Sequence, residues 1–395
     1  MAAAVDPGAT PTAARALAPD LARGGMLLLI ALANVHLYLY GRSLGVRGYP
    51  REVEGVDRVV TVVQLMLVDG RAYPLFGLLF GYGIVQLTRR RAAVGLPATA
   101  VTRLVRQRGM WLVAIGLVHG LLLWSGDIVG AYGLLAVLLA GLLVRGSDRG
   151  LLVTAGSGVL LITLLYSGSG VALPDDPQAF LTSVIISDPV EAAQARAVEW
   201  AGLGLLVQTI GVFAAVALGA WAARRRLLDE PQRHRRLLRW VAVVGLAAAV
   251  LGGLPIALIA AQVWTSPSLV AALLSGSLHA LSGYAGGLGY AALFGLLAIR
   301  LARDPGPVTR AVAACGQRSL SCYLAQSVAF VPLLPAWTLG LGADARLWQA
   351  ALVGVGAWAV ILVVAAASDR ASYRGPAELL LRRLTYGPRR ARQPL

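Results

Sequence analysis

Long runs of apolar residues repeat along almost the whole chain and are separated by short clusters of arginine and turn residues. A helix needs roughly 20 such residues to cross a bilayer, so the pattern predicts an all-α, polytopic transmembrane bundle of about ten spans. The predicted spans lie near residues 24–41, 59–88, 108–124, 127–144, 150–167, 200–222, 238–262, 276–300, 309–335 and 346–367.

The second apolar run is too long for one plain helix. Pro74, followed by Gly77, Gly81 and Gly83, predicts a kink or a broken segment inside it, because proline removes a backbone donor from the helix. Asp69 and Arg71 stand immediately before Pro74. This run therefore combines a predicted helix interruption with charged residues at membrane depth.

The segments between the spans divide the chain. Residues 1–22 are rich in alanine, proline and threonine, which predicts a disordered cytoplasmic N-terminus. Residues 23–222 form a predicted N-terminal transmembrane half, and residues 238–367 form a C-terminal half. Residues 368–395 form a basic cytoplasmic tail.

Composition supports this reading. Of 395 residues, 57% are hydrophobic and 14% are charged, whereas a soluble domain carries about 25% charged residues. The net charge of +16 does not indicate nucleic-acid binding, because the arginines lie in short runs between apolar segments rather than on one basic face. The expected partner is the lipid bilayer, and the sequence leaves the oligomeric state open.

The arginines also predict an orientation. Alternate loops, near residues 89–108, 145–149, 224–239 and 300–310, are rich in arginine, as is the tail. By the positive-inside rule both termini are cytoplasmic. The first external segment departs from the pattern, since Arg42, Arg47, Arg51 and Arg58 share it with acidic residues.

Three of the four histidines, His36, His119 and His279, lie near the outer ends of predicted spans. Asp127 begins the fourth span on the same side. Ionisable groups at this depth cost free energy, so they require a functional or structural reason. Spans from separate parts of the sequence are expected to bring these residues to one outward-facing cavity.

His119 and Asp127 form the main candidate site. A carboxylate can hold the tautomer of an imidazole and stabilise its cation, which is the arrangement that a general base needs. Trp124, between them, is an interface or packing residue or contacts substrate. His36 and His279 have an alternative reading as interfacial residues with satisfied hydrogen bonds. No nucleotide or metal motif is present.

Several segments resemble the YeiB-like family of bacterial membrane proteins, whose C-terminal half is a domain of unknown function (domain of unknown function 418). They are Asp20 to Gly24 followed by Asn34, residues 75–83, Gly116 to Gly120 with Trp124 to Ile128, residues 316–327 and residues 375–387. The resemblance implies a multi-pass protein of the bacterial plasma membrane, and it assigns no activity.

The spacing from Arg23 and Gly24 to Asn34 is distantly similar to membrane acyltransferases of the heparan-glucosaminide acetyltransferase type. These move an acyl group from cytoplasmic acyl-CoA to an acceptor on the far side. The resemblance implies that Asn34 is an active-site amide. It places Gly45 where the relatives have a catalytic histidine, and His36 or His119 would have to replace that residue.

Our working hypothesis is a transacylase that passes an acyl group from an acyl-CoA-like co-substrate to a small-molecule or cell-envelope acceptor. The catalytic candidates are His119, Asp127, Asn34 and His36, and the substrate-binding candidates are Arg71, Asp69, Trp124, His279 and Arg23. No metal is expected. Two alternatives stay open: a proton-coupled transporter, which would use buried charges and a kinked helix, and an accessory membrane protein.

Overall fold

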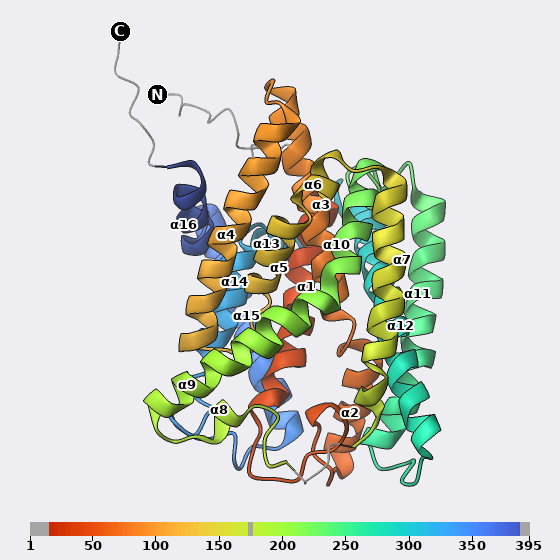
Figure 1. Ribbon diagram of the computed structural model, residues 1–395, viewed down its shortest axis with the longest axis vertical. Helices are drawn as coiled ribbons and strands as arrows, with labels where there is room; N and C mark the ends of the chain where they lie inside the picture. The colour runs from red at the N-terminus through yellow and green to blue at the C-terminus, as the bar shows by residue number, and fades with distance from the viewer. Residues whose placement is uncertain (1–15, 173–176, 388–395) are drawn as a thin grey trace.

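The computed structural model describes residues 16–172 and 177–387. These residues form a bundle of helices whose connecting segments gather at its two ends (Figure 1). Among them, strand-like pairing is limited to the isolated bridges Tyr40 with Ala179 and Leu44 with Pro50. The predicted all-α class is confirmed.

The first half of the chain contains these helices: α1 (Leu17–Val35), α2 (Gly55–Leu67), α3 (Ala72–Ala93), α4 (Ala98–Leu122), α5 (Val129–Leu138), α6 (Ala140–Arg145), α7 (Asp148–Leu165), α8 (Thr182–Ile185), α9 (Pro189–Glu199) and α10 (Gln208–Arg224). Short 3₁₀ turns η2 (His36–Tyr38), η3 (Val46–Gly48) and η4 (Ser167–Gly170) lie in the connections, and the π-helical segment η5 (Trp200–Val207) joins α9 to α10.

The second half contains α11 (Arg235–Ala260), α12 (Leu269–Leu301), α13 (Pro307–Gln317), α14 (Ser319–Phe330), α15 (Leu347–Arg370) and α16 (Pro376–Tyr386). The start of α1 and α16 lie at the same end of the bundle, which is the end where α3 passes to α4 (Figure 1). The helices pack around two main cores of buried apolar side chains.

Seven helical stretches of the described residues are long and apolar enough to cross a membrane: Leu17–Tyr38, Gly55–Ala93, Asp148–Leu165, Pro189–Arg224, Arg235–Ala260, Leu269–Leu301 and Leu347–Arg370. The other predicted spans correspond to α4, to α5 with α6, and to α13 with α14. The figure of about ten spans and the cytoplasmic termini stay predictions.

Helix boundaries differ from the predicted ones in three places. Helix α1 begins at Leu17, inside the segment predicted to be disordered, whose residues 1–15 lie outside the described part. The predicted basic tail contains α16, and its residues 388–395 are likewise outside that part. The second span is broken at residues 68–71, just before the Pro74 position that indicated the break.

Candidate functional site

Three side chains from two distant parts of the chain form a continuous hydrogen-bonded chain, which we call the relay. His119 lies in the last turn of α4, Asp127 precedes α5, and Ser327 lies on α14. His119 Nδ1 is 2.8 Å from Asp127 Oδ1, and His119 Nε2 is 2.9 Å from Ser327 Oγ. The two candidate residues His119 and Asp127 are therefore in direct contact.

The α4–α5 turn holds the acid in place. Asp127 Oδ2 accepts a hydrogen bond from the backbone N–H of Gly130 at 2.7 Å, which satisfies a donor in the first turn of α5. Gly116 lets the two helices approach closely, because a Cβ there would lie 2.4 Å from both Asp127 Oδ2 and Gly130 N. The His119 carbonyl accepts from Leu123 and Trp124, and these bonds end α4 beside the imidazole.

The geometry fixes the proton pattern of the imidazole. An ionised Asp127 only accepts hydrogen bonds, so Nδ1 of His119 carries the proton that faces it. Nε2 is then left with a lone pair, which accepts the hydroxyl proton of Ser327. A serine oriented in this way can become a nucleophile when the histidine takes its proton.

Aromatic residues enclose the relay. Tyr323 lies 5.4 Å from the His119 ring between centroids, and its hydroxyl accepts from Ile128 N at 3.3 Å. Tyr38 stacks on Trp124 at 4.5 Å. The Tyr38 hydroxyl lies near Ser327, and among the described residues neither it nor Trp124 Nε1 makes a hydrogen bond of good geometry. Both residues are buried beside the relay.

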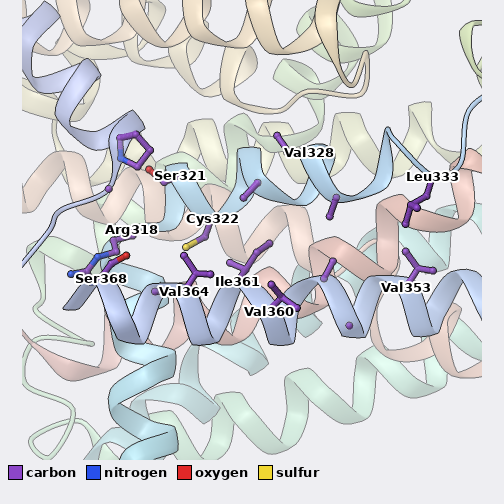
Figure 2. A pocket seen from close by; sticks show the side chains of 17 residues that line it. Arg318, Ser321, Cys322, Val328, Leu333, Val353, Val360, Ile361, Val364 and Ser368 are labelled. Carbon is purple, nitrogen blue, oxygen red and sulfur yellow. The ribbon is translucent and has the colours of Figure 1, made fainter. Parts of the chain in front are cut away.

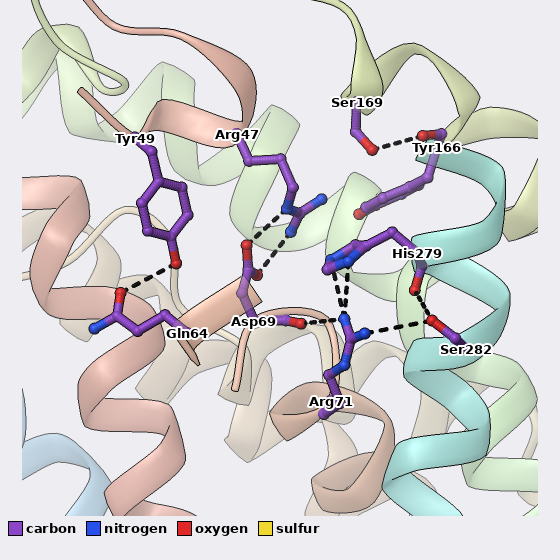
Figure 3. Close-up of polar contacts among 9 residues, drawn as sticks. All are labelled: Arg47, Tyr49, Gln64, Asp69, Arg71, Tyr166, Ser169, His279 and Ser282. Atoms are coloured by element: carbon purple, nitrogen blue, oxygen red, sulfur yellow. Dashed lines mark hydrogen bonds and ion pairs between the residues drawn. The ribbon is translucent and has the colours of Figure 1, made fainter. Parts of the chain in front are cut away.

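A second buried group, which we call the arginine cluster, consists of Arg47, Asp69, Arg71 and His279 (Figure 3). Arg47 from η3 donates from Nε and Nη2 to the two Asp69 oxygens, at 2.6 and 2.8 Å. Burial lowers the pKa of the Arg47 guanidinium, but the adjacent Asp69 more than offsets this and leaves the pKa above its usual value. Arg47 also adopts a left-handed backbone conformation, with φ of 58°.

Arg71 connects the break between α2 and α3 to helices α11 and α12. It is fully buried, and its Nη1 donates to the Asp69 carbonyl at 2.7 Å and contacts His279 Nδ1 at 2.9 Å. Its Nη2 donates to the carbonyl of Ala249 on α11 at 2.6 Å and lies 3.3 Å from Ser282 Oγ. A break in a membrane helix frees backbone carbonyls, and Arg71 satisfies the one at Asp69.

The structure therefore places the three outward histidines in different surroundings rather than in one cavity. His119 belongs to the relay, and His279 belongs to the arginine cluster. His36 stacks on Tyr49 at 4.4 Å, next to that cluster, and within the described part of the chain its ring nitrogens make no hydrogen bond of good geometry. The separation follows from helix packing, because α12 meets the break at residues 68–71 while α4 meets α14.

The remaining candidates are scattered. Arg23 is bonded to Asp20 and to the carbonyl of Leu79 on α3, at 3.3 Å in both cases. Asn34 on α1 is half-buried, and its side chain makes no hydrogen bond among the described residues. Within residues 16–172 and 177–387, no group of three or more histidine, cysteine or acidic side chains could hold a metal ion.

Sequence reasoning missed two of the residues described above. Ser327 is the last residue of the segment 316–327 that resembles the family, but it received no role. Arg47 was visible only as an external arginine that departed from the charge pattern. Neither contact could be derived locally, because Ser327 lies 208 positions from His119 and Arg47 lies 22 positions from Asp69.

Comparison with known proteins agrees with the resemblance. Residues 222–388 match a family described as protein of unknown function (DUF418). The chain is 26% identical over 363 residues to the uncharacterized protein YxaH of Bacillus subtilis, covering 84% of this chain and 83% of that protein. It is 37% identical over 113 residues to the uncharacterized protein YeiB of Escherichia coli, covering 27% of this chain and 26% of YeiB.

The relay connects residues inside and outside the region that matches the family. Ser327 lies within residues 222–388, whereas His119 and Asp127 lie before them. This chain is thus similar to the DUF418 family through residues 222–388 and to YxaH over most of its length.

Proposed function

We propose that this protein is a membrane transacylase in which Ser327 carries the acyl group between donor and acceptor. The observation that supports the proposal is the unbroken chain of hydrogen bonds from Asp127 through His119 to Ser327. Acyl-transfer enzymes on unrelated folds use the same order of acid, imidazole and hydroxyl, so the arrangement is recognised by geometry rather than by sequence position.

The donor half-reaction uses a thioester of the acyl-CoA class. His119 Nε2 takes the hydroxyl proton of Ser327 while Oγ attacks the carbonyl carbon of the donor. The Oγ–C bond forms and the C–S bond of the thioester breaks. His119 then gives the proton to the departing sulfur, and the products are a free thiol and an acyl ester on Ser327.

The acceptor half-reaction reverses these roles. A hydroxyl or amine of a small-molecule or cell-envelope acceptor gives its proton to His119 and attacks the acyl ester. The new bond to the acceptor forms, the Oγ–C bond breaks, and His119 returns the proton to Ser327. Asp127 keeps its charge throughout and stabilises the imidazolium that forms in each half-reaction.

Helix α1 and the turn η2 that follows it supply candidate donors for the oxyanion. The Tyr38 hydroxyl lies near Ser327. Asn34 precedes Tyr38 by four positions and carries an amide without a hydrogen-bond partner among the described residues. A preorganised donor of this kind contributes most to catalysis in a site without water, and the relay is buried.

The charge pattern supports the direction of transfer. Arginine-rich loops lie at the end predicted to be cytoplasmic, where their cations suit the phosphates of acyl-CoA. The turn that holds Asp127 lies toward the opposite end (Figure 1). In this scheme the donor arrives from the cytoplasm, the acceptor meets the acyl ester near the outer face, and the protein resides in the bacterial plasma membrane.

The acyl ester on Ser327 is directly measurable. The purified protein is incubated separately with acetyl-CoA and palmitoyl-CoA, quenched in acid and digested, and peptides are analysed by mass spectrometry. The proposal predicts the mass of the acyl group on the peptide that contains Ser327, no such mass in Ser327→Ala, and a strong decrease in His119→Ala. Ser282→Ala, beside the arginine cluster, is the matched control and keeps the modification. Absence of acyl-Ser327 with both donors, in protein that remains folded, would count against the proposal.

A further inference from the structure

A long groove runs between α14 and α15 on a flank of the bundle (Figure 2). Its volume is about 610 Å³, within the range of small-molecule sites. Most of its lining is apolar, with side chains such as Val328, Leu333, Val353 and Val360. Valine side chains at its edge are open to the surroundings, since Val328 is 58% and Val360 is 64% exposed.

The groove is elongated and has one polar end. Along α15 its lining runs from Val353 to Ser368, which corresponds to about 22 Å at the helical rise of 1.5 Å per residue. Polar lining residues gather at the Ser368 end, where Arg318 and Ser321 also lie (Figure 2). A cavity of this length and polarity matches an acyl chain that enters from one surface of a hydrocarbon core about 30 Å thick.

The lining polar groups themselves are already paired. Arg318 donates to the carbonyls of Tyr373 and Ala314 and forms an ion pair with Asp369 at 3.1 Å. The Ser321 hydroxyl donates to Glu378. One further cation stands beside this end, because Arg374 directly precedes the lining residue Gly375. Arg374 is exposed and has no hydrogen-bond or ion-pair partner among the described residues.

The groove is separate from the relay. Ser327 is buried and points to His119 on α4, whereas the neighbouring groove residues of α14, Val328 and Ala329, line the side that faces α15. A molecule in the groove would therefore lie on the other side of α14 from the relay. An inference about its occupant does not depend on the proposed acyl transfer.

We propose that this groove binds one acyl chain of an anionic phospholipid from the surrounding bilayer, with the headgroup at Arg374. The apolar lining accepts the chain, and the exposed valines open it to the lipid. Arg374 follows the last membrane-candidate helix, where the positive-inside rule places cations close to anionic headgroups. A headgroup with a net negative charge meets an unpaired cation at this position, whereas a headgroup without net charge gains less from it.

The test is native mass spectrometry of the full-length protein in detergent, after addition of phosphatidylglycerol or of phosphatidylcholine. Gly356→Trp fills the groove, because Gly356 lines it and a Cβ added there meets no atom within 4 Å. Val363→Trp is the matched control, since Val363 lies on the same helix, is 69% exposed and does not line the groove. The Arg374→Gln variant tests the headgroup with a surface change that leaves the helix packing intact.

The proposal predicts one retained phosphatidylglycerol in preference to phosphatidylcholine, an occupancy about tenfold lower in Gly356→Trp, and no change in Val363→Trp. Arg374→Gln weakens phosphatidylglycerol binding about fivefold and leaves phosphatidylcholine unaffected. Equal retention of the two lipids by the wild type, or unchanged retention by Gly356→Trp, would overturn it. A dimer that dissociates in Gly356→Trp would assign the groove to a second copy of the chain and overturn it as well.

Discussion

The relay and the arginine cluster are both buried, both contain a histidine, and both connect helices that are distant in sequence, yet their hydrogen bonds end differently. The relay contains one acid and one imidazole and ends on the hydroxyl of Ser327, a group that can lose its proton. The arginine cluster sets two guanidinium groups against one carboxylate, and Arg71 donates mainly to backbone carbonyls. A buried ionisable residue in a membrane protein is therefore not by itself a sign of catalysis.

The difference also concerns charge. In the relay, one carboxyl group faces one imidazole and accepts the Gly130 N–H. In the arginine cluster, two Arg47 side-chain donors hold the Asp69 carboxylate, and Arg71 contacts backbone carbonyls, a hydroxyl and an imidazole. We infer that the cluster stabilises the broken α2–α3 span, whereas the relay performs chemistry.

Asp69→Ala should have the largest effect. It leaves two buried guanidinium groups without a carboxylate, and breaking a buried ion pair in this way costs about 3–5 kcal/mol. Thermal or denaturant unfolding in detergent measures the loss. Asp148→Ala is the control, because the Asp148 side chain is 44% exposed and its pairs with Arg224 and Arg225 should contribute only about 0–1 kcal/mol. If the two variants were equally stable, the result would contradict a stabilising role of the arginine cluster at the break between α2 and α3.

Gly70→Ala should cost about 1–3 kcal/mol in the same unfolding assay. Gly70 has φ of +78°, and a Cβ there would lie 2.7 Å from His279 Nε2, so the substitution strains the backbone and displaces the imidazole. Gly156→Ala provides the comparison. Gly156 lies within α7 and has open space around its Cβ position, so this change should be neutral or slightly stabilising. An unaffected Gly70→Ala protein would show that the break is loosely packed.

Ser327→Ala should cost only about 1 kcal/mol, the contribution of one hydrogen bond, while it removes acyl transfer. This variant distinguishes the relay from the arginine cluster most clearly, because it is expected to change the free energy of unfolding little and to abolish acyl transfer. The measurements are unfolding and the release of free thiol from acyl-CoA. Wild-type thiol release by folded Ser327→Ala would contradict the role of the hydroxyl as nucleophile.

Tyr38→Phe should leave stability within about 0.5 kcal/mol of the wild type, because the hydroxyl makes no hydrogen bond of good geometry among the described residues. If that hydroxyl donates to the oxyanion, thiol release falls about a hundredfold, which is typical of removing one such donor. Unchanged thiol release would instead leave Asn34 as the remaining candidate donor on α1.

The apolar pattern was sufficient to predict the helical class and the interruption of the second span, because both depend on local sequence. His119 and Asp127 were grouped as one candidate site for the same reason, since eight positions across a tight turn keep the two residues close, but only the structure shows that they are in contact. Helix α9 was missed although its start is marked by Asp188, which accepts from Val190 N and Glu191 N and precedes a proline at the first helical position.

Long-range pairing could not be predicted from the chain. Ser327 joins the relay, and His279 joins the arginine cluster, only because α14 and α12 pack where they do. The arginines of the first segment predicted to be external depart from the loop charge pattern for a similar reason. Arg47 turns inward to Asp69, Arg42 donates to the Ala343 carbonyl at 2.5 Å, and Arg51 donates to the Leu44 carbonyl at 3.2 Å. These arginines serve intramolecular bonds, so they do not follow the loop pattern of the other arginines.

The most direct test of the difference between the two regions compares two histidine variants in one assay. Thiol release from acyl-CoA is measured for His119→Ala and His279→Ala and is expressed per folded molecule, with the folded fraction taken from unfolding curves. We predict that His119→Ala reduces the rate by about 10³-fold or more, whereas His279→Ala unfolds more easily but keeps a rate close to that of the wild type. A normal rate in folded His119→Ala, or a selective loss of rate in folded His279→Ala, would contradict the assignment of chemistry to the relay.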